Sequence, residues 1–277
     1  MTTIPEDREP LIRLLTVQVG LDRELASALL DAARDTERRI LRERKGIRLS
    51  QLTILLRDLR GIQSRLWVGE IAEIIASRMR TVENAASRAA RSLDEFLENA
   101  VGRRRAQILV EAFSARVQQG LRVDASRVPQ QLSTAVYRNA ALSSGKIETI
   151  IRSNLIRGNG AREMAEQVRP LIDPRVRGGV SHAATRLGRT ELANAFHDRQ
   201  IVEADREWVR GVRWNLSRSH PRKDECDRLA SHDAGLGAGV WDKRAVPRKP
   251  HPQCMCYMTY DVMTPDEALE LIIARAV

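Results

Sequence analysis

Apolar residues recur every three or four positions through most of the first two hundred residues of the chain. This spacing is the period of an amphipathic α-helix. One clear run comprises Leu52, Ile54, Leu55, Leu59, Ile62, Leu66, Ile71, Ile74 and Ile75. Aromatic residues make up only 4% of the chain, which favours helix-on-helix packing over a β-sandwich. We therefore expect a mainly α protein, with an elongated N-terminal helical bundle followed by a small α+β C-terminal domain.

The expected helices begin and end at recognisable residues. Asp22 is predicted to cap a helix that the Lys-Gly pair at 45–46 ends, because glycine readily adopts the left-handed conformation that closes helices. The next helix is predicted from Ser50, and it runs as far as residue 97 unless Gly61 and Gly69 interrupt it.

Two shorter helices are expected between residues 147 and 171, joined by a turn at 157–160. A DNA-reading helix-turn-helix is one interpretation of this pair. An ordinary αα-hairpin is the favoured alternative, since a glycine turn between two helices is common in any α domain.

The last part of the chain has a different pattern. Residues 212–216 and 255–262 alternate apolar and polar side chains, which predicts two strands that form a β-hairpin. The segment from Thr264 to Glu267 has the pattern of a capping box with proline in the first turn, so a helix is expected to follow it. Gly235–Gly239 is glycine-rich, but no strand precedes it and no helix follows it, so it is predicted to be a turn rather than a phosphate cradle.

All three cysteines lie in the last fifth of the chain, close to two histidines. Thiolate and imidazole groups at short spacing suit tetrahedral zinc. The predicted ligands are Cys226, His251, Cys254 and Cys256, with His220 as an alternate ligand. Cys254 and Cys256 point to the same side of an extended strand. A structural zinc in a Cys/His knot is one interpretation, and reduced cysteines packed without metal in a small core are the other.

Charge and the N-terminal sequence limit the cellular setting. Lys plus Arg number 46 against 36 Asp plus Glu, a net charge of +10. This excess indicates contact with nucleic acid or an acidic protein surface, or else an arginine-rich set of solvated helix faces. The N-terminus lacks the order of a signal peptide, and no apolar run is long enough to cross a membrane. We expect the protein to start in the cytoplasm, where cysteines stay reduced.

The motifs also follow a characteristic order. The helical Arg-Thr-Glu comes first, then a tryptophan strand, then Ser-x-His-Pro-Arg-x-Asp-x-Cys-Asp, and finally His-Pro-x-Cys-x-Cys. This order resembles the phage Mu F-like head morphogenesis family of minor capsid proteins, over about residues 145 to 262. The matching residues are Arg189, Thr190, Glu191, Trp214, His220, Pro221, Asp224, Cys226, Asp227, His251, Pro252, Cys254 and Cys256.

Two departures from the family pattern bear on the metal. Many relatives carry a second cysteine at the position of Leu229, so here a histidine, His251 or His220, must complete any four-ligand site. Met255 stands where arginine is common in the family. We predict a helical N-terminal region at residues 1–144 and the Mu F-like domain at residues 145–277.

The resemblance implies a non-enzymatic minor head protein of a tailed bacteriophage. Such a protein associates with the portal protein, and with capsid or scaffolding protein, during procapsid assembly. It is expected in the host cytoplasm during assembly and then in the head interior of the virion, with no membrane partner. Some family members are linked to DNA binding and ejection, so double-stranded DNA is a further possible partner.

Two alternative functions follow from the same residues. The first is a DNA-binding protein of the phage genome, based on the positive charge. The second, less favoured, is a metal-dependent nuclease, with Glu191 and Asp224 as its carboxylates.

Overall fold

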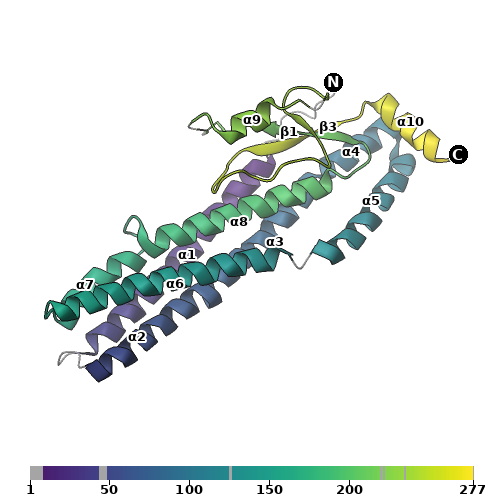
Figure 1. The fold of residues 1–277 in the computed structure, drawn as a ribbon. Coiled ribbons are helices and arrows are strands. Elements are labelled where there is room, and N and C mark those ends of the chain that lie inside the picture. Colours follow the sequence, from purple (N-terminus) through teal and green to yellow (C-terminus); the bar gives the residue numbers. More distant parts are fainter. Residues whose placement is uncertain are drawn as a thin grey trace. The chain divides into compact units, whose positions relative to one another are not determined.

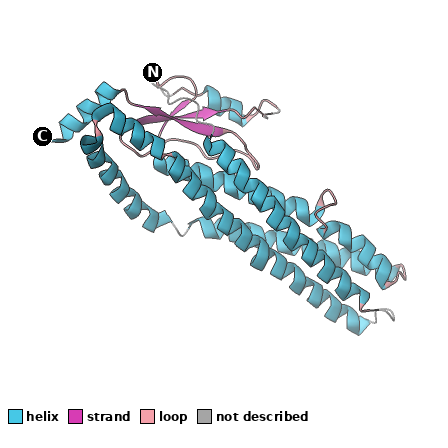
Figure 2. Ribbon diagram, turned by 180° about the vertical axis from the view of Figure 1, so that it is seen from behind, coloured by secondary structure: helices cyan, strands magenta, loops and turns pink. Residues whose placement is uncertain are grey.

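The computed structural model describes residues 9–43, 49–124, 127–218, 220, 222–233 and 235–276. Helices form most of this part of the chain, and a small antiparallel sheet lies near its C-terminal end, as the sequence predicted (Figures 1 and 2). The predicted helix end at 45–46 and Pro221 lie outside the described residues. The elements are α1 (Glu9–Leu41), α2 (Leu49–Ser64), the π-helix η1 (Arg65–Ile71), α3 (Ala72–Ala89), α4 (Arg91–Val101), α5 (Arg103–Asp124), α6 (Arg127–Ile156), α7 (Ala161–Ile172), α8 (Gly179–Glu203), β1 (Val209–Asn215), α9 (Glu225–Ser231), β2 (Val240–Asp242), β3 (Tyr257–Val262) and α10 (Pro265–Ala276).

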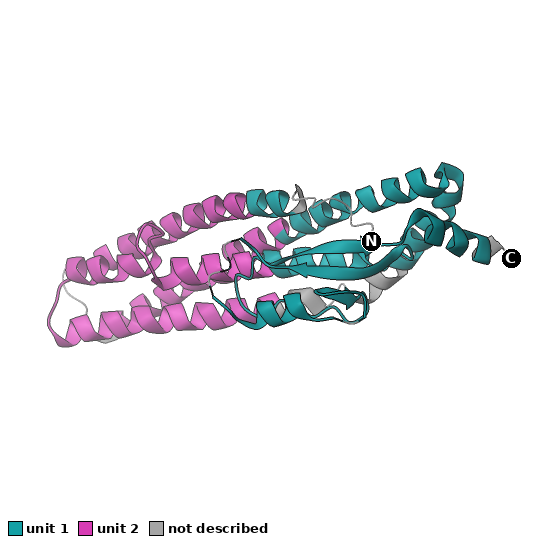
Figure 3. Cartoon of the chain, turned by 90° about the horizontal axis from the view of Figure 1, so that it is seen from above, with its two compact units in different colours: residues 1–17, 79–125, 192–277 teal, residues 18–78, 126–191 magenta. Residues whose placement is uncertain are grey.

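The chain divides into two compact units (Figure 3). Unit 1 comprises residues 1–17, 79–125 and 192–277, and unit 2 comprises residues 18–78 and 126–191. Each unit takes segments from both sides of residue 144. The predicted boundary at 144/145 therefore does not separate the two units, and it stays a prediction of where the family resemblance begins.

Unit 2 is built only from helices. Trp67 of η1 is fully buried, and its Nε1 donates a hydrogen bond to Ser143 Oγ of α6 at 3.1 Å. The predicted pair of helices with a turn at 157–160 is present as α6 and α7, although α6 starts much earlier than the sequence indicated. Asn154 Nδ2 joins the two helices by donating to Gln167 Oε1 at 2.9 Å.

One sequence-based helix start was wrong, and the structure decides whether two glycines interrupt the next helix. Asp22 does not cap a helix, because α1 continues through it and its carboxylate instead pairs with Arg189 of α8. Gly61 and Gly69 do not break the helix that follows residue 49, since the chain continues through them as α2, η1 and α3. The interruption comes at Ala90, between α3 and α4. The helical backbone thus continues through both glycines, although each costs about 1 kcal/mol in helix propensity relative to alanine.

Unit 1 contains the sheet, whose strand order is β2-β1-β3. β1 pairs antiparallel with both neighbours, so that Val212 lies opposite Trp241 of β2 and Tyr260 of β3. The predicted strands are thus neighbours, but they do not form a simple hairpin. The expectation missed β2, which is too short to show an alternating pattern.

Two apolar clusters lie in unit 1, and the first of them joins the sheet to α4. The first comprises Ala90, Leu93, Ala204, Val209, Val212, Met258 and Val262. The second comprises Leu97, Val101, Ala106, Leu109, Trp208, Ala268 and Ile272. The predicted capping box of α10 is confirmed: Glu267 Oε2 accepts from the Thr264 amide at 2.6 Å, and Thr264 Oγ1 accepts from the Glu267 amide at 3.3 Å. Among the described helices, none combines the length and apolar character that a bilayer crossing requires.

Candidate metal centre

A capping box fixes the first turn of α9, which carries Cys226. Asp224 is the N-cap residue, and its Oδ1 accepts a hydrogen bond from the Cys226 amide at 2.7 Å. Asp227 Oδ2 accepts in return from the Asp224 amide at 2.7 Å. This reciprocal pair satisfies amides that a helix N-terminus otherwise leaves unbonded. The backbone at Cys226 is therefore held firmly, with its side chain fully buried.

Cys254 and Cys256 lie in the loop that leads into β3. Gln253 adopts a left-handed backbone conformation, with φ of 58°, so the chain turns sharply between His251 and Cys254. The buried ammonium of Lys249 donates to the carbonyl oxygens of Cys254 and Cys256, at 3.1 Å and 2.5 Å. Burial lowers the pKa of Lys249, while the neighbouring cysteines raise it.

Three sulfur atoms converge, and one imidazole lies beside one of them. The Sγ atoms of Cys226, Cys254 and Cys256 all lie within 4.8 Å of one another, and those of Cys226 and Cys254 are 3.5 Å apart. His251 Nε2 lies 3.3 Å from Cys226 Sγ. His251 Nδ1 lies 3.1 Å from the Pro252 carbonyl, which can only accept, so Nδ1 carries a proton, and Nε2 also lies 3.4 Å from Asp224 Oδ2.

Two of the three thiols have a raised pKa and one has a lowered pKa. Burial raises the pKa of the Cys226 thiol, and the hydrogen bond with Cys254, together with burial, raises the pKa of Cys256. The hydrogen bond with Cys256 and the charge of Lys249 lower the pKa of Cys254, against the effect of burial. Without a cation, Cys226 and Cys256 therefore stay protonated, whereas a positive ion among the sulfur atoms would stabilise all three as thiolates. These cysteines can therefore hold a metal ion.

His220 is engaged differently from His251. Its Nε2 donates to Asp227 Oδ2 at 2.9 Å, and this hydrogen bond raises the pKa of His220. His220, Asp224 and Asp227 also form a set of donor atoms within 4.8 Å of one another. His220 thus braces the capping box, whereas the described contacts of His251 include a cysteine sulfur.

Apolar side chains enclose the sulfur atoms. Trp214 and Leu229 belong to the same buried cluster as the three cysteines, and Trp241 packs against it. Leu229, where the resemblance leads to the expectation of a further cysteine, is a buried apolar residue of this cluster. Trp241 Nε1 donates to the Leu229 carbonyl at 3.0 Å.

The other predicted motif residues belong to unit 2. Arg189 pairs with Asp22, and Thr190 Oγ1 donates to the Arg186 carbonyl at 2.7 Å. Glu191 is also a residue of unit 2, whereas the cysteines belong to unit 1. Within unit 1, the fold brings together Cys226, Cys254 and Cys256, with His251 beside Cys226.

The glycine-rich segment is a turn, as the sequence predicted. Asp233 Oδ1 accepts from the amides of Gly235 and Gly237 at 2.8 and 2.9 Å. Gly235, Gly237 and Gly239 all have positive φ values. Two amides that a phosphate cradle would need are therefore already bonded within the protein.

The sequence interpretation missed Lys249 and the capping role of Asp224 and Asp227. The spacing Asp224-x-x-Asp227 was a usable signal, because two acceptors three residues apart can satisfy each other's amides. Lys249 gave no such signal, since its partners are backbone carbonyls. Comparisons of the chain with protein-family models, curated proteins and solved structures found no match.

Proposed function

We propose that Cys226, Cys254, Cys256 and His251 hold one structural zinc ion in unit 1. The convergence of three buried cysteine sulfurs, with His251 Nε2 beside the sulfur of Cys226, carries this proposal. A tetrahedron with zinc–sulfur bonds of about 2.3 Å has sulfur–sulfur edges of about 3.8 Å and slightly shorter sulfur–nitrogen edges. The separations of 3.5 Å and 3.3 Å around Cys226 are close to such edges.

The donor set favours a structural over a catalytic ion. Three thiolates and one imidazole complete four-coordination, whereas a catalytic zinc keeps one position for water or substrate. The ligands come from α9 and from the loop before β3, so the ion would fix these two segments together. The hydrogen bond from His251 to the Pro252 carbonyl is the kind of outer contact that orients a ligating imidazole.

We further propose that the chain is a non-enzymatic minor head protein of a tailed bacteriophage, associated with the portal during procapsid assembly. The ordered motif set supports this role through its resemblance to the Mu F-like family. The Cys/His part of that motif set includes the three cysteines that pack in one buried cluster with Trp214 of β1. The nuclease alternative is less well supported, because the proposed coordination leaves no position for an activated water.

Co-assembly tests the proposed role. The chain would be expressed with its portal and the other procapsid proteins, and the particles separated on a density gradient. We expect the wild-type chain to co-sediment with portal-containing particles, and the Cys256→Ser chain to do so much less. Wild-type chain that stays at the top of the gradient while portal particles form would contradict the proposed role.

A further inference from the structure

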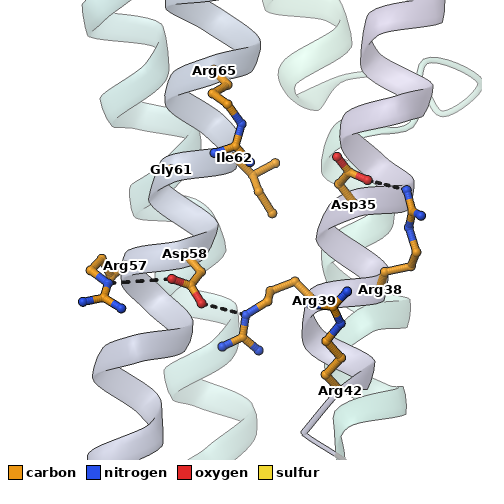
Figure 4. Close-up of a pocket in the computed structure, with 9 residues that line it drawn as sticks. All are labelled: Asp35, Arg38, Arg39, Arg42, Arg57, Asp58, Gly61, Ile62 and Arg65. Atoms are coloured by element: carbon orange, nitrogen blue, oxygen red, sulfur yellow. Dashed lines mark hydrogen bonds and ion pairs between the residues drawn. The ribbon is translucent and has the colours of Figure 1, made fainter.

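An arginine-lined groove lies in unit 2, between α1 and α2 (Figure 4). It has a volume of about 480 Å³. Its lining residues are Asp35, Arg38, Arg39, Arg42, Arg57, Asp58, Gly61, Ile62 and Arg65. Five arginines against two aspartates give the lining a net charge of +3.

Helical spacing brings these side chains to one groove. Arg38 and Arg39 of α1 both lie three or four positions from Asp35 and from Arg42, so these four residues share one face of the helix and its C-terminal turn. The residues from α2 and η1 recur in the same way from Arg57 to Arg65. Two charged faces therefore meet along the groove.

Part of this charge serves the fold. Arg39 Nε donates to Asp58 Oδ2 at 2.9 Å, and its Nη1 donates to Glu43 Oε1 at 2.8 Å. The Arg39 side chain is only 15% exposed, and its hydrogen bond lowers the pKa of Asp58. This bridge links α1 to α2, so the Arg39 guanidinium is already occupied by hydrogen bonds within the protein.

Other arginines of the groove are not held by a comparable pair of hydrogen bonds between the helices. Within the part of the chain that the structure describes, Arg42 and Arg65 make no ion pair. Arg57 is 76% exposed and lies 3.7 Å from Asp58 Oδ1, at the outer limit of an ion pair. Three guanidinium groups are thus directed to solvent around one concave surface.

The rest of the lining indicates what kind of anion fits. Single-stranded nucleic acid is usually bound on aromatic side chains that stack with the bases, and no aromatic residue lines this groove. A duplex presents its phosphates outward and keeps its bases stacked inside. Arginine forks match phosphate oxygens well.

We propose that this groove binds the phosphate backbone of duplex DNA through Arg42, Arg57 and Arg65, without reading the bases. The inference goes beyond the proposed head-protein role. Its failure would leave the zinc and portal results unchanged. The contact would add to the electrostatic attraction that the net charge of +10 provides.

Gly61 offers a test that leaves every charge in place. A Cβ at this position would meet only Arg65 Nη1, at 3.7 Å, so the wall of the groove has room for the first atom of a side chain there. Leucine also has a higher helix propensity than glycine, so Gly61→Leu is expected to fold. Gly145 of α6 has open space around it and does not line the groove, so Gly145→Leu is the matched control.

The charge test uses two triple variants with the same loss of charge. One changes Arg42, Arg57 and Arg65 to glutamine, and the other changes the exposed Arg157, Arg162 and Arg177 of unit 2. Binding to a short mixed-sequence DNA duplex would be measured by fluorescence anisotropy between about 50 and 200 mM salt.

We expect the groove triple variant to bind at least about tenfold more weakly, with a salt slope smaller by about 2 to 3. Gly61→Leu should also weaken binding, whereas the control triple variant and Gly145→Leu should stay close to wild type. Equal loss in the two triple variants would show that only net charge matters and would overturn the site. Undiminished binding by Gly61→Leu would overturn it too, as would absence of wild-type binding at low salt.

Discussion

Gly211 of β1 gives the most direct test of the sheet packing around the cysteine cluster. A Cβ at this position would lie 2.7 Å from Val240 Cγ1 and 2.8 Å from the Trp241 carbonyl oxygen. The carbonyl is fixed by the pairing of β1 with β2, and Val240 is fully buried, so neither neighbour can easily move away. Overpacking of this kind costs about 1–3 kcal/mol. We expect Gly211→Ala to destabilise the β1–β2 pair by about 2 kcal/mol.

Hydrogen exchange measured by mass spectrometry reports this change locally. A loss of about 2 kcal/mol corresponds to exchange of the β1 and β2 amides that is roughly thirty times faster. Gly145→Ala is the chemical control, because nothing lies within 4 Å of the added Cβ and alanine favours a helix by about 0.5–1 kcal/mol. Unchanged exchange in β1 and β2 of Gly211→Ala would refute the packing argument.

Three other substitutions test separate parts of unit 1. Burial lowers the pKa of His197 from 6.5 to about 4. As the pH falls, His197 therefore binds a proton in the unfolded chain before it does so in the folded protein. The free energy of unfolding should then fall by about 2 kcal/mol between about pH 7 and pH 5. Urea titrations at both pH values should show this loss in the wild type and not in His197→Gln; equal loss in both would contradict it. Asp224→Ala should speed amide exchange in α9 about fivefold, for about 1 kcal/mol of lost capping, whereas Asp224→Asn should not. Lys249→Met should weaken zinc binding about tenfold in chelator competition, because two carbonyls next to the ligands lose their donor. Lys243→Met is the control, since Lys243 donates to the carbonyls of Arg206 and Val209 instead.

Helical periodicity was the most reliable sequence signal. It predicted the mainly α fold because each helix buries one apolar face, which leaves a regular trace in the sequence. The capping box of α10 was predicted correctly, since both of its acceptors are local side chains. Helix boundaries were less predictable: Asp22 is a good N-cap residue by type, yet it lies within α1 and pairs with Arg189, a partner 167 positions away.

The candidate site shows the same division between local and long-range information. The spacing of Cys254 and Cys256 and the presence of Cys226 were visible in the sequence, and the fold brings the three sulfurs together. The sequence left His251 and His220 as alternatives, because the distinction depends on the turn at Gln253 and on the capping box of α9. The arginine groove was not visible either, since its two faces come from separate helices.

The zinc content of the purified protein tests the central claim most directly. Metal would be measured by inductively coupled plasma mass spectrometry after gel filtration, for the wild type, His251→Asn and His220→Asn. We predict one zinc per chain in the wild type and in His220→Asn, and a large loss in His251→Asn, because His251 Nε2 lies 3.3 Å from Cys226 Sγ whereas His220 Nε2 is hydrogen-bonded to Asp227. Absence of zinc from the wild type, or its loss in His220→Asn but not in His251→Asn, would contradict the proposed site.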